Sequence, residues 1–284
     1  MDPLVGHAAK RGAMRIDGSG TLRASCVLCP NPGPMTLDGT NTWILREPGA
    51  RNVLVVDPGP HHERHLERVA RMVQEQGSQV TQALLTHGHA DHAAGARYFS
   101  ELTGCRVRAV DPAHRISGDG LDDGEVVEAD GLRVRVLRTP GHTADSVSFH
   151  LPADDVVLTG DTVLGRGTTV IVGEDGGDLG DYLNSLIRLR DLVDSANIRA
   201  LLPAHGPVCT DPLRKLNSYI QHREERLGQI RDAVAAGADT LAEIVDRVYA
   251  DVDPALRAAT EASVRAQVRY LVDRGDVPVE VLAD

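Results

Sequence analysis

The chain has 284 residues, enough for one full-sized domain and a small second one, and its 42% hydrophobic and 25% charged residues are ordinary for a globular protein. A net charge of −11 argues against electrostatic binding of duplex DNA, because neutralising phosphates requires a basic face. No stretch has the length of a membrane span and the start has no apolar signal region, so we expect a cytoplasmic protein without a membrane partner.

The four cysteines indicate no disulfide framework in a chain of this size. Cys26 and Cys29 form a single C-x-x-C, whereas a structural zinc site usually needs a second such pair or nearby histidines. We therefore interpret them as ordinary reduced cysteines.

After an opening of about 20 residues with no clear period, the first part of the chain alternates β-rich runs with amphipathic helices. Residues 61–77, for example, place Leu66, Val69, Met72 and Val73 at helical spacing and end at a glycine. The predicted strands are 40–47, 51–59, 81–87 and 105–110, and the predicted helices are 61–77 and 94–104.

From residue 124 to residue 158 the pattern changes to consecutive strands separated by turn residues. An amphipathic helix at 181–195 and a strand within 198–206 follow. Alternating strands and helices followed by a β-meander predict an α/β fold (α+β in some schemes) with two sheets and outer helices, rather than one doubly wound parallel sheet.

Beyond Pro212 every pattern is helical. The second helix of this part begins with Thr240 and Glu243 in capping-box spacing. Three helices and a strand predict a small winged-helix-like unit, so we divide the chain into a catalytic domain, 1–212, and a C-terminal domain, 213–284. The predicted elements of the C-terminal domain are helices at 213–236, 240–249 and 255–275 and a terminal strand at 277–282.

Candidate metal ligands stand directly after predicted strands. Loops at strand ends can converge on one rim of a two-sheet fold, whereas scattered surface histidines would have no reason to follow strands. The sequence therefore predicts a metal site, and its ligands are His87, His89, Asp91, His92, His142, Asp161 and His205.

Imidazole and carboxylate groups suit zinc, and also manganese and iron. His87 and His89, two positions apart, can hold one ion. Asp91 and His92 can face a second ion, and Asp161 is suited to bridge the two. Two ions about 3.5–4 Å apart would hold a bridging hydroxide at neutral pH. We therefore expect a binuclear hydrolase with two divalent cations, Zn²⁺ first and Mn²⁺ or Fe²⁺ as alternatives.

These motifs resemble the metallo-β-lactamase superfamily. THGHADH is similar to its hallmark loop, PGHT to its next histidine, TGDT to its bridging aspartate and PAHG to its last histidine. The resemblance implies a four-layer αββα sandwich, which agrees with the order of strands and helices above.

The resemblance also implies a role for each candidate ligand. Asp161 would lie between two metals, and Asp57 in VVDPG would support the metal loop from behind. The first metal would be held by His87, His89 and His142, and the second by Asp91, His92 and His205.

Longer segments resemble one branch, the β-lactamase-like protein 2 family. Residues 31–45, 160–169 and 181–186 carry this resemblance, together with the C-terminal helices. The animal member of that family is a mitochondrial endoribonuclease, and the family has a C-terminal winged-helix-like domain. The resemblance implies phosphodiesters of single-stranded RNA as substrate, although the acidic charge does not favour RNA.

A glyoxalase-II-like thioesterase, or another hydrolase of small-molecule esters, is the alternative. It would keep the same ligands but usually has a different helical tail, so the winged-helix-like interpretation favours the RNA branch. A true β-lactamase is disfavoured because those enzymes are exported and lack the bridging aspartate that Asp161 supplies. The short spacing from Asp161 to His205 excludes the branch of RNA-processing enzymes with a large inserted domain.

A non-enzymatic alternative is a nucleic-acid-binding module in the C-terminal unit, with residues 254–275 as the recognition helix. Acidic residues outnumber basic ones from Leu213 onward, whereas a DNA reader is normally basic. We therefore expect this unit to pack on the sandwich and shape the substrate groove.

For catalysis, Asp91 is the best-placed proton acceptor and donor besides its role as a metal ligand. Thr40, Thr168 and Thr169 are candidates for contact with the substrate, and turn or cap hydroxyls are the alternative interpretation.

Overall fold

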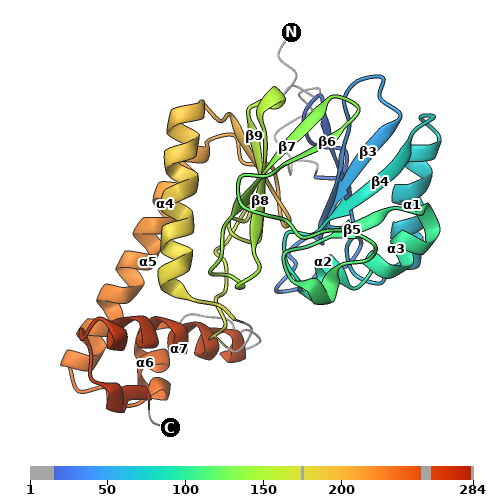
Figure 1. Cartoon of the computed structure of the whole chain (residues 1–284). Helices are drawn as coiled ribbons and strands as arrows, with labels where there is room; N and C mark the ends of the chain where they lie inside the picture. The colour runs from blue at the N-terminus through green and yellow to red at the C-terminus, as the bar shows by residue number, and fades with distance from the viewer. Residues whose placement is uncertain (1–15, 174–175, 251–256, 283–284) are drawn as a thin grey trace, which may run out of the picture.

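Two mixed β-sheets form the centre of the fold (Figure 1). The computed structural model describes residues 16–173, 176–250 and 257–282, and within them each sheet has five strands. The first sheet has the order β1 (Ala24–Leu28), β2 (Asn41–Leu45), β3 (Asn52–Val56), β4 (Gln79–Leu84) and β5 (Arg106–Arg108). The second has the order β10 (Ala200–Pro203), β9 (Val156–Gly160), β8 (Val147–Leu151), β7 (Leu132–Arg138) and β6 (Val126–Ala129).

Helices connect the parallel strand pairs, because a parallel pair needs a long crossover. The helix α1 (Glu63–Gln74) links β3 to β4, and α2 (Ala90–Ala93) and α3 (Ala96–Thr103) link β4 to β5. The helix α4 (Leu179–Ala196) links β9 to the parallel strand β10. The remaining pairs are antiparallel, and β6 to β9 form the predicted meander.

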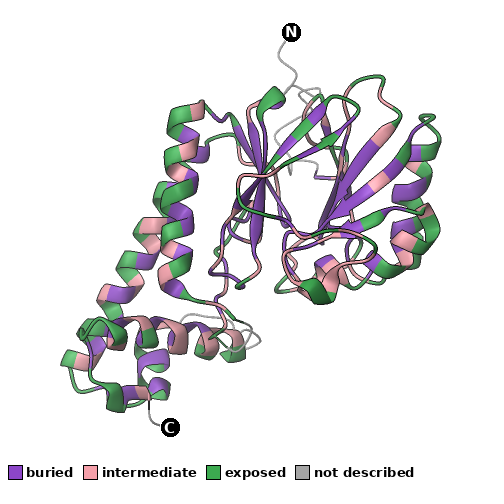
Figure 2. Cartoon of the chain, viewed as in Figure 1, coloured by how far each residue is buried: buried purple, intermediate pink, exposed green. Residues whose placement is uncertain are grey.

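Successive side chains of a strand point to opposite faces of its sheet, so one strand contributes to two hydrophobic layers. In β3, Leu54 and Val56 belong to the cluster between the two sheets, whereas Val53 and Val55 belong to the cluster under α1 and α3. On the other side, α4 covers the second sheet (Figure 2). The predicted architecture of two sheets with outer helices is confirmed.

The carboxyl ends of several strands meet at one rim. Leu84 ends β4 beside Val56 of the parallel strand β3, and Pro203 of β10 lies beside Gly160 of β9. The strand β7 runs in the same direction as β9, because β8 is antiparallel to both. Every candidate ligand therefore leaves its strand toward the same rim.

The C-terminal part is helical, with α5 (Pro212–Ala235), α6 (Leu241–Val248) and α7 (Arg257–Asp273). The predicted cap of α6 is present, since the Thr240 side chain accepts a hydrogen bond from the Glu243 N–H. Buried residues of all three helices share one core with α4 and the outer face of the second sheet. None of the described helices is both long and apolar enough to cross a membrane.

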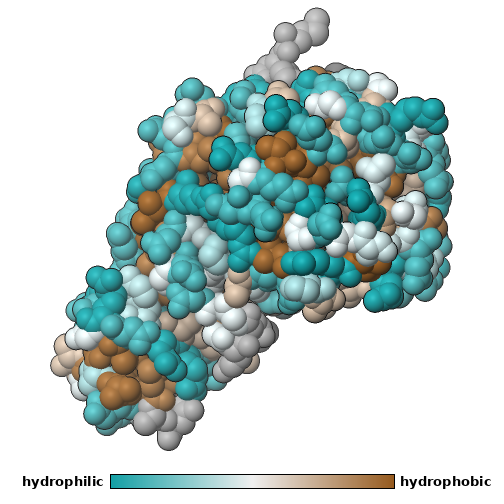
Figure 3. All heavy atoms as spheres, viewed as in Figure 1, coloured by the Kyte–Doolittle hydropathy of each residue, from teal (hydrophilic) through white to brown (hydrophobic). Residues whose placement is uncertain are grey.

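The prediction of a terminal strand at 277–282 is wrong. Residues Val279–Leu282 form a 3-10 helix, in which Val281 packs into the helical core. The alternating pattern there is typical of a strand, but no described strand lies beside it to pair with its backbone. The wing of a winged helix is therefore absent from the described residues. In Figure 3 apolar surface gathers over the end of these helices. Val279 in the 3-10 helix is 60% exposed.

Two predictions concern residues that are only partly described. The first is the opening of about 20 residues without a clear period, of which residues 1–15 lie outside the described residues. The second is the recognition helix predicted at 254–275, whose first residues fall in the undescribed range 251–256. The remainder of that helix corresponds to α7.

Candidate metal centre

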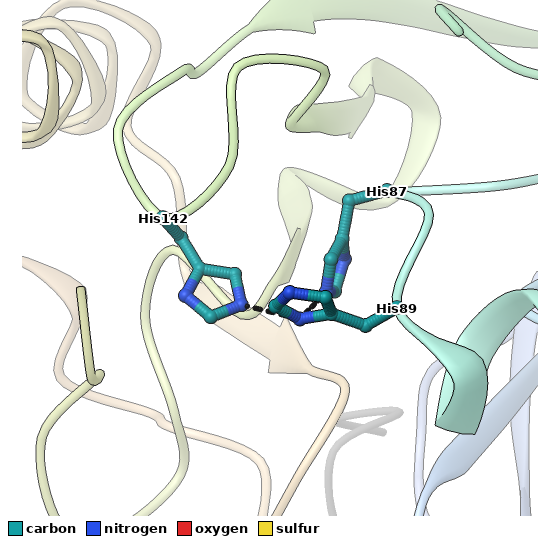
Figure 4. A group of neighbouring side chains, drawn as sticks. All are labelled: His87, His89 and His142. Carbon is teal, nitrogen blue, oxygen red and sulfur yellow. Dashed lines mark hydrogen bonds between the residues drawn. The ribbon is translucent and has the colours of Figure 1, made fainter. Parts of the chain in front are cut away.

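Three histidines from two loops come together in the first half of the site (Figure 4). His87 and His89 follow β4, and His142 follows β7. His89 Nδ1 lies 3.0 Å from His87 Nε2 and 3.1 Å from His142 Nε2. Ligand nitrogens around a tetrahedral zinc ion stand about 3.3 Å apart, so these separations suit one shared ion.

The second half of the site contains Asp91, His92 and His205. Asp91 Oδ2 lies 3.4 Å from His92 Nε2 and 3.2 Å from His205 Nε2. Asp91 and His92 belong to α2, and His205 follows β10 from the opposite sheet.

Asp161 lies between these two groups. Its Oδ2 atom is 3.7 Å from His142 Nε2 and 3.6 Å from His92 Nε2, whereas Oδ1 is 3.4 Å from His205 Nε2. One carboxylate therefore faces both halves of the site, as expected for a bridging ligand. The structure brings all seven predicted ligands together.

The donor atoms fit divalent cations. His92 Nε2, His205 Nε2 and Asp161 Oδ1 are buried, and no hydrogen-bond partner satisfies them within the described residues. Their mutual contacts lack hydrogen-bond geometry despite the short distances. Buried polar atoms without partners are rare in proteins, so this cluster requires another explanation. Metal ions on the shared side would supply the missing partners.

The opposite ring nitrogen of four histidines is bonded to the protein, which orients each ring toward the site. His142 Nδ1 donates to the Val170 carbonyl at 2.8 Å, and His205 Nδ1 donates to the Gly39 carbonyl at 3.1 Å. The other two bonds join His87 Nδ1 to Thr86 Oγ1 at 3.0 Å and His92 Nδ1 to Asp57 Oδ2 at 2.9 Å.

Asp57 supports the metal loop from behind, as the resemblance implies. Besides His92, it accepts hydrogen bonds from the Thr86 N–H at 2.8 Å and the Thr86 hydroxyl at 2.7 Å. Its φ of 50° is in the left-handed region, a conformation that non-glycine residues seldom adopt. The Thr86 hydroxyl thus connects the Asp57 carboxylate to His87.

The electrostatics of the site separate the two groups of histidines. Burial lowers the pKa of His87 well below its ordinary value, and it also lowers the pKa of His142. Burial opposes charge on His205 too, but the carboxylates of Asp161 and Asp91 raise the pKa of His205 to about 10. The two carboxylates thus favour a positive charge at this position. A divalent cation can replace that positive charge, so metal uptake would release protons.

The three predicted substrate threonines differ in their surroundings. Thr40 and Thr169 are buried; the Thr40 hydroxyl accepts from Asn31 Nδ2, and the Thr169 hydroxyl donates to the Asp161 carbonyl. These positions favour the structural interpretation. Thr168 is exposed on the same loop, so contact with the substrate stays a prediction there.

Sequence reasoning missed several supporting groups. Thr86 directly precedes the first ligand, and its position inside THGHADH was the available signal. The carbonyls of Gly39 and Val170 leave no such signal, because every residue has one. His114 was also missed: its ring lies over Gly88, so close that a Cβ atom there would stand 2.3 Å from His114 Nε2.

Comparisons with known proteins agree with this geometry. Residues 35–205 match the model of the Metallo-beta-lactamase superfamily. The chain is also 32% identical over 259 residues to the Beta-lactamase-like protein 2 homolog of Caenorhabditis elegans, covering 88% of this chain and 84% of that protein. The chain belongs to the metallo-β-lactamase superfamily. With its clusters of histidine and aspartate, it is a hydrolase of the metallo-β-lactamase fold, and the predicted enzyme class is confirmed.

Two further relatives extend the comparison. The chain is 34% identical over 240 residues to an Atrochrysone carboxyl ACP thioesterase of Aspergillus fumigatus, covering 78% of this chain and 72% of that protein. Among solved structures, a metallo-beta-lactamase family protein from Thermus thermophilus superposes with a TM-score of 0.73 at 23% identity, covering 89% and 94% of the two chains. At that identity the likeness supports the fold alone.

Proposed function

We propose that this metallo-β-lactamase-fold hydrolase uses two divalent metal ions to cleave an acyl thioester. The observation that carries the substrate class is the 34% identity to an acyl-carrier-protein thioesterase over 78% of the chain. That match is longer than residues 35–205, so it extends beyond the segment that defines the superfamily.

The proposed metal sites follow the two groups of side chains described above. One ion would be held by His87, His89 and His142 and the other by Asp91, His92 and His205, with Asp161 shared. When bound, two such ions would activate water and polarise the scissile carbonyl. Zn²⁺ is the first choice for this donor set, and Mn²⁺ or Fe²⁺ are alternatives.

Asp91 is proposed as the proton carrier of the reaction. Its side chain is 28% exposed, whereas the side chain of its neighbour His92 is fully buried. A carboxylate at the mouth of the site can reach both the attacking water and the leaving group.

The winged-helix-like interpretation favoured an RNA substrate. The strand expected to form the wing is a 3-10 helix instead, so that support for RNA is weakened. The surroundings of the site also argue against an RNA substrate. Arg166 follows Asp161 on the exposed loop, but it forms an ion pair with Asp38 at 2.5 Å. An RNA backbone would need unpaired cations at the mouth. The net charge of −11 points in the same direction.

Cleavage of single-stranded RNA is the second candidate. It rests on the resemblance to the β-lactamase-like protein 2 family and on the 32% identity to a homolog of that protein over 88% of the chain. We also propose that residues 213–284 act as a helical domain beside the site rather than as a reader of duplex DNA.

The test is a direct comparison of substrates with metal-loaded, full-length protein. An S-acyl pantetheine thioester, S-lactoylglutathione, a labelled single-stranded RNA and a chromogenic cephalosporin would be assayed in parallel, with Asp161→Ala as control. We expect the thioesters to be hydrolysed and the control to be inactive. Cleavage of RNA alone would replace the first candidate by the second, and equal rates for the control and the natural chain would contradict both.

A further inference from the structure

One face of α5 holds the loop that follows Asp161. Lys215, Tyr219 and Arg223 stand at positions i, i+4 and i+8 of α5, so they share one side of the helix. Lys215 Nζ donates to the Gly165 carbonyl at 3.3 Å, and the Tyr219 hydroxyl donates to the Gly167 carbonyl at 3.0 Å.

The third contact reaches closest to the metal centre. Arg223 Nη2 donates to the carbonyl of Thr169. The hydroxyl of Thr169 donates to the Asp161 carbonyl at 2.7 Å, and the next carbonyl, that of Val170, accepts from His142 Nδ1 at 2.8 Å. Through two adjacent residues, Arg223 is therefore connected to one candidate ligand from each of two loops.

Arg223 is an unusual residue for this position. It is 3% exposed, and no acidic residue in the described part of the chain forms an ion pair with it. Its Nε atom has no hydrogen-bond partner there, and its guanidinium lies 5.2 Å from the centroid of the Tyr182 ring. Burying a charge that has no ion-pair partner costs free energy. Packing alone therefore does not explain an arginine here.

We propose that Arg223 is a positioning residue of the metal centre. Its guanidinium fixes the peptide at Thr169 and Val170, and this peptide in turn fixes the main chain at Asp161 and the ring of His142. The helix α5 contributes no ligand, but it sets where two ligands stand. This inference rests on the proposed metal site.

The same helix provides a matched control. Arg226 also lies over an aromatic ring, 4.6 Å from the centroid of Tyr249, and its Nη1 donates to a carbonyl, that of Val248, at 2.9 Å. These contacts lead to the end of α6 and away from the ligands. Arg223→Met and Arg226→Met therefore each remove a ring contact and a hydrogen bond to a carbonyl from the same helix, although Arg223 is buried and Arg226 only half-buried. Only the first residue is connected to the metal centre.

The experiment is a Co²⁺ titration of the full-length chain, followed by visible absorption, with affinity obtained by competition with a chelator. If the natural chain binds no Co²⁺, the proposed metal site itself is wrong. If it binds, we expect affinity to fall about tenfold in Arg223→Met with an altered d–d spectrum, and by less than about twofold in Arg226→Met. Arg223→Lys, which keeps a donor near Thr169, should recover part of the loss.

An unchanged affinity and spectrum in Arg223→Met, or an equal loss in both methionine variants, would overturn the proposal. If Arg223→Met does not fold, Thr169→Val provides the second test, since it removes the hydroxyl that bonds to the Asp161 carbonyl at 2.7 Å and to the Thr162 carbonyl at 3.3 Å. A perturbed Co²⁺ spectrum in that variant supports the proposed connection. A natural spectrum contradicts it.

Discussion

The rim of the sandwich and the helices α6 and α7 differ in whether their buried polar groups have hydrogen-bond partners. At the rim, two histidines and an aspartate have buried side-chain atoms that no group among the described residues satisfies. In α6 and α7 the buried side chains are mainly aliphatic, and the buried Gln267 is bonded to Tyr249 and Ser263. Buried polar groups without partners cost free energy, so the rim is built for a ligand, whereas α6 and α7 are built for packing.

The two regions also differ in function: the rim supplies the candidate ligands, and the C-terminal helices pack beside it. Chemistry is concentrated in loops that leave strands at one edge, where four separate segments deliver their side chains. The C-terminal helices α5, α6 and α7 supply no candidate ligand within the described residues, and α5 is connected to the site by the face that bonds to residues 164–169. Each of the following changes tests whether this division holds.

The largest effect is expected at Asp161, the residue shared by both halves of the site. Asp161→Ala should lower turnover roughly a thousandfold or more and release at least one metal ion per chain, because the bridging carboxylate is lost. Rates with the best substrate and metal content by mass spectrometry would be measured together. Full activity in this variant would remove the two-metal scheme.

A change within α6 should affect stability and leave the rim intact. Ile244 is fully buried in α6, and Ile244→Ala should lower the free energy of unfolding by about 3 kcal/mol through lost burial and the remaining cavity. Urea denaturation would give the loss, and a Co²⁺ titration of the folded variant should match that of the natural chain. A large loss of metal affinity would show that the two regions are not separable at this point.

The smallest effect concerns a buried histidine of the sandwich outside the ligand set. His65 is bonded to Thr42 at 2.9 Å, and burial lowers its pKa to about 4. The unfolded chain, with the ordinary value of 6.5, therefore binds more protons between these two values, so stability falls as the pH drops from 7 toward 4. At pH 5 the loss due to His65 should be about 2 kcal/mol.

The measurement is urea denaturation of metal-free protein at pH 7 and pH 5, for the natural chain and for His65→Gln. The difference between the two chains isolates His65 from the other histidines. A smaller pH dependence in His65→Gln is expected. An identical dependence in both would show that this histidine is not a source of acid sensitivity.

Much of the sandwich and of its site could be predicted from the residues. The alternation of apolar residues predicted the strands of the meander. His87 and Asp161 could be predicted as candidate ligands because each comes shortly after an apolar strand. Acceptors such as the Val170 carbonyl could not be predicted, because a main-chain group is the same for every residue. The role of Arg223 could not be predicted either, because its partner Thr169 is 54 positions away in the sequence and only the fold brings the two residues together.

The C-terminal end shows the converse error. Residues 277–282 alternate as a strand does, but alternation predicts a strand only where a neighbouring strand can pair with it. Val281 instead packs among helices, and the hydrophobic pattern alone could not distinguish these surroundings. Local sequence thus predicted the element poorly where its tertiary partner was missing.

The central claim is that the rim holds two metal ions that share Asp161. Anomalous diffraction at the zinc edge, from crystals of the metal-loaded chain, tests it most directly. The account predicts two peaks, one among His87, His89 and His142 and one among Asp91, His92 and His205, with the Asp161 carboxylate between them. A single peak at saturating zinc, or peaks away from these side chains, would contradict it.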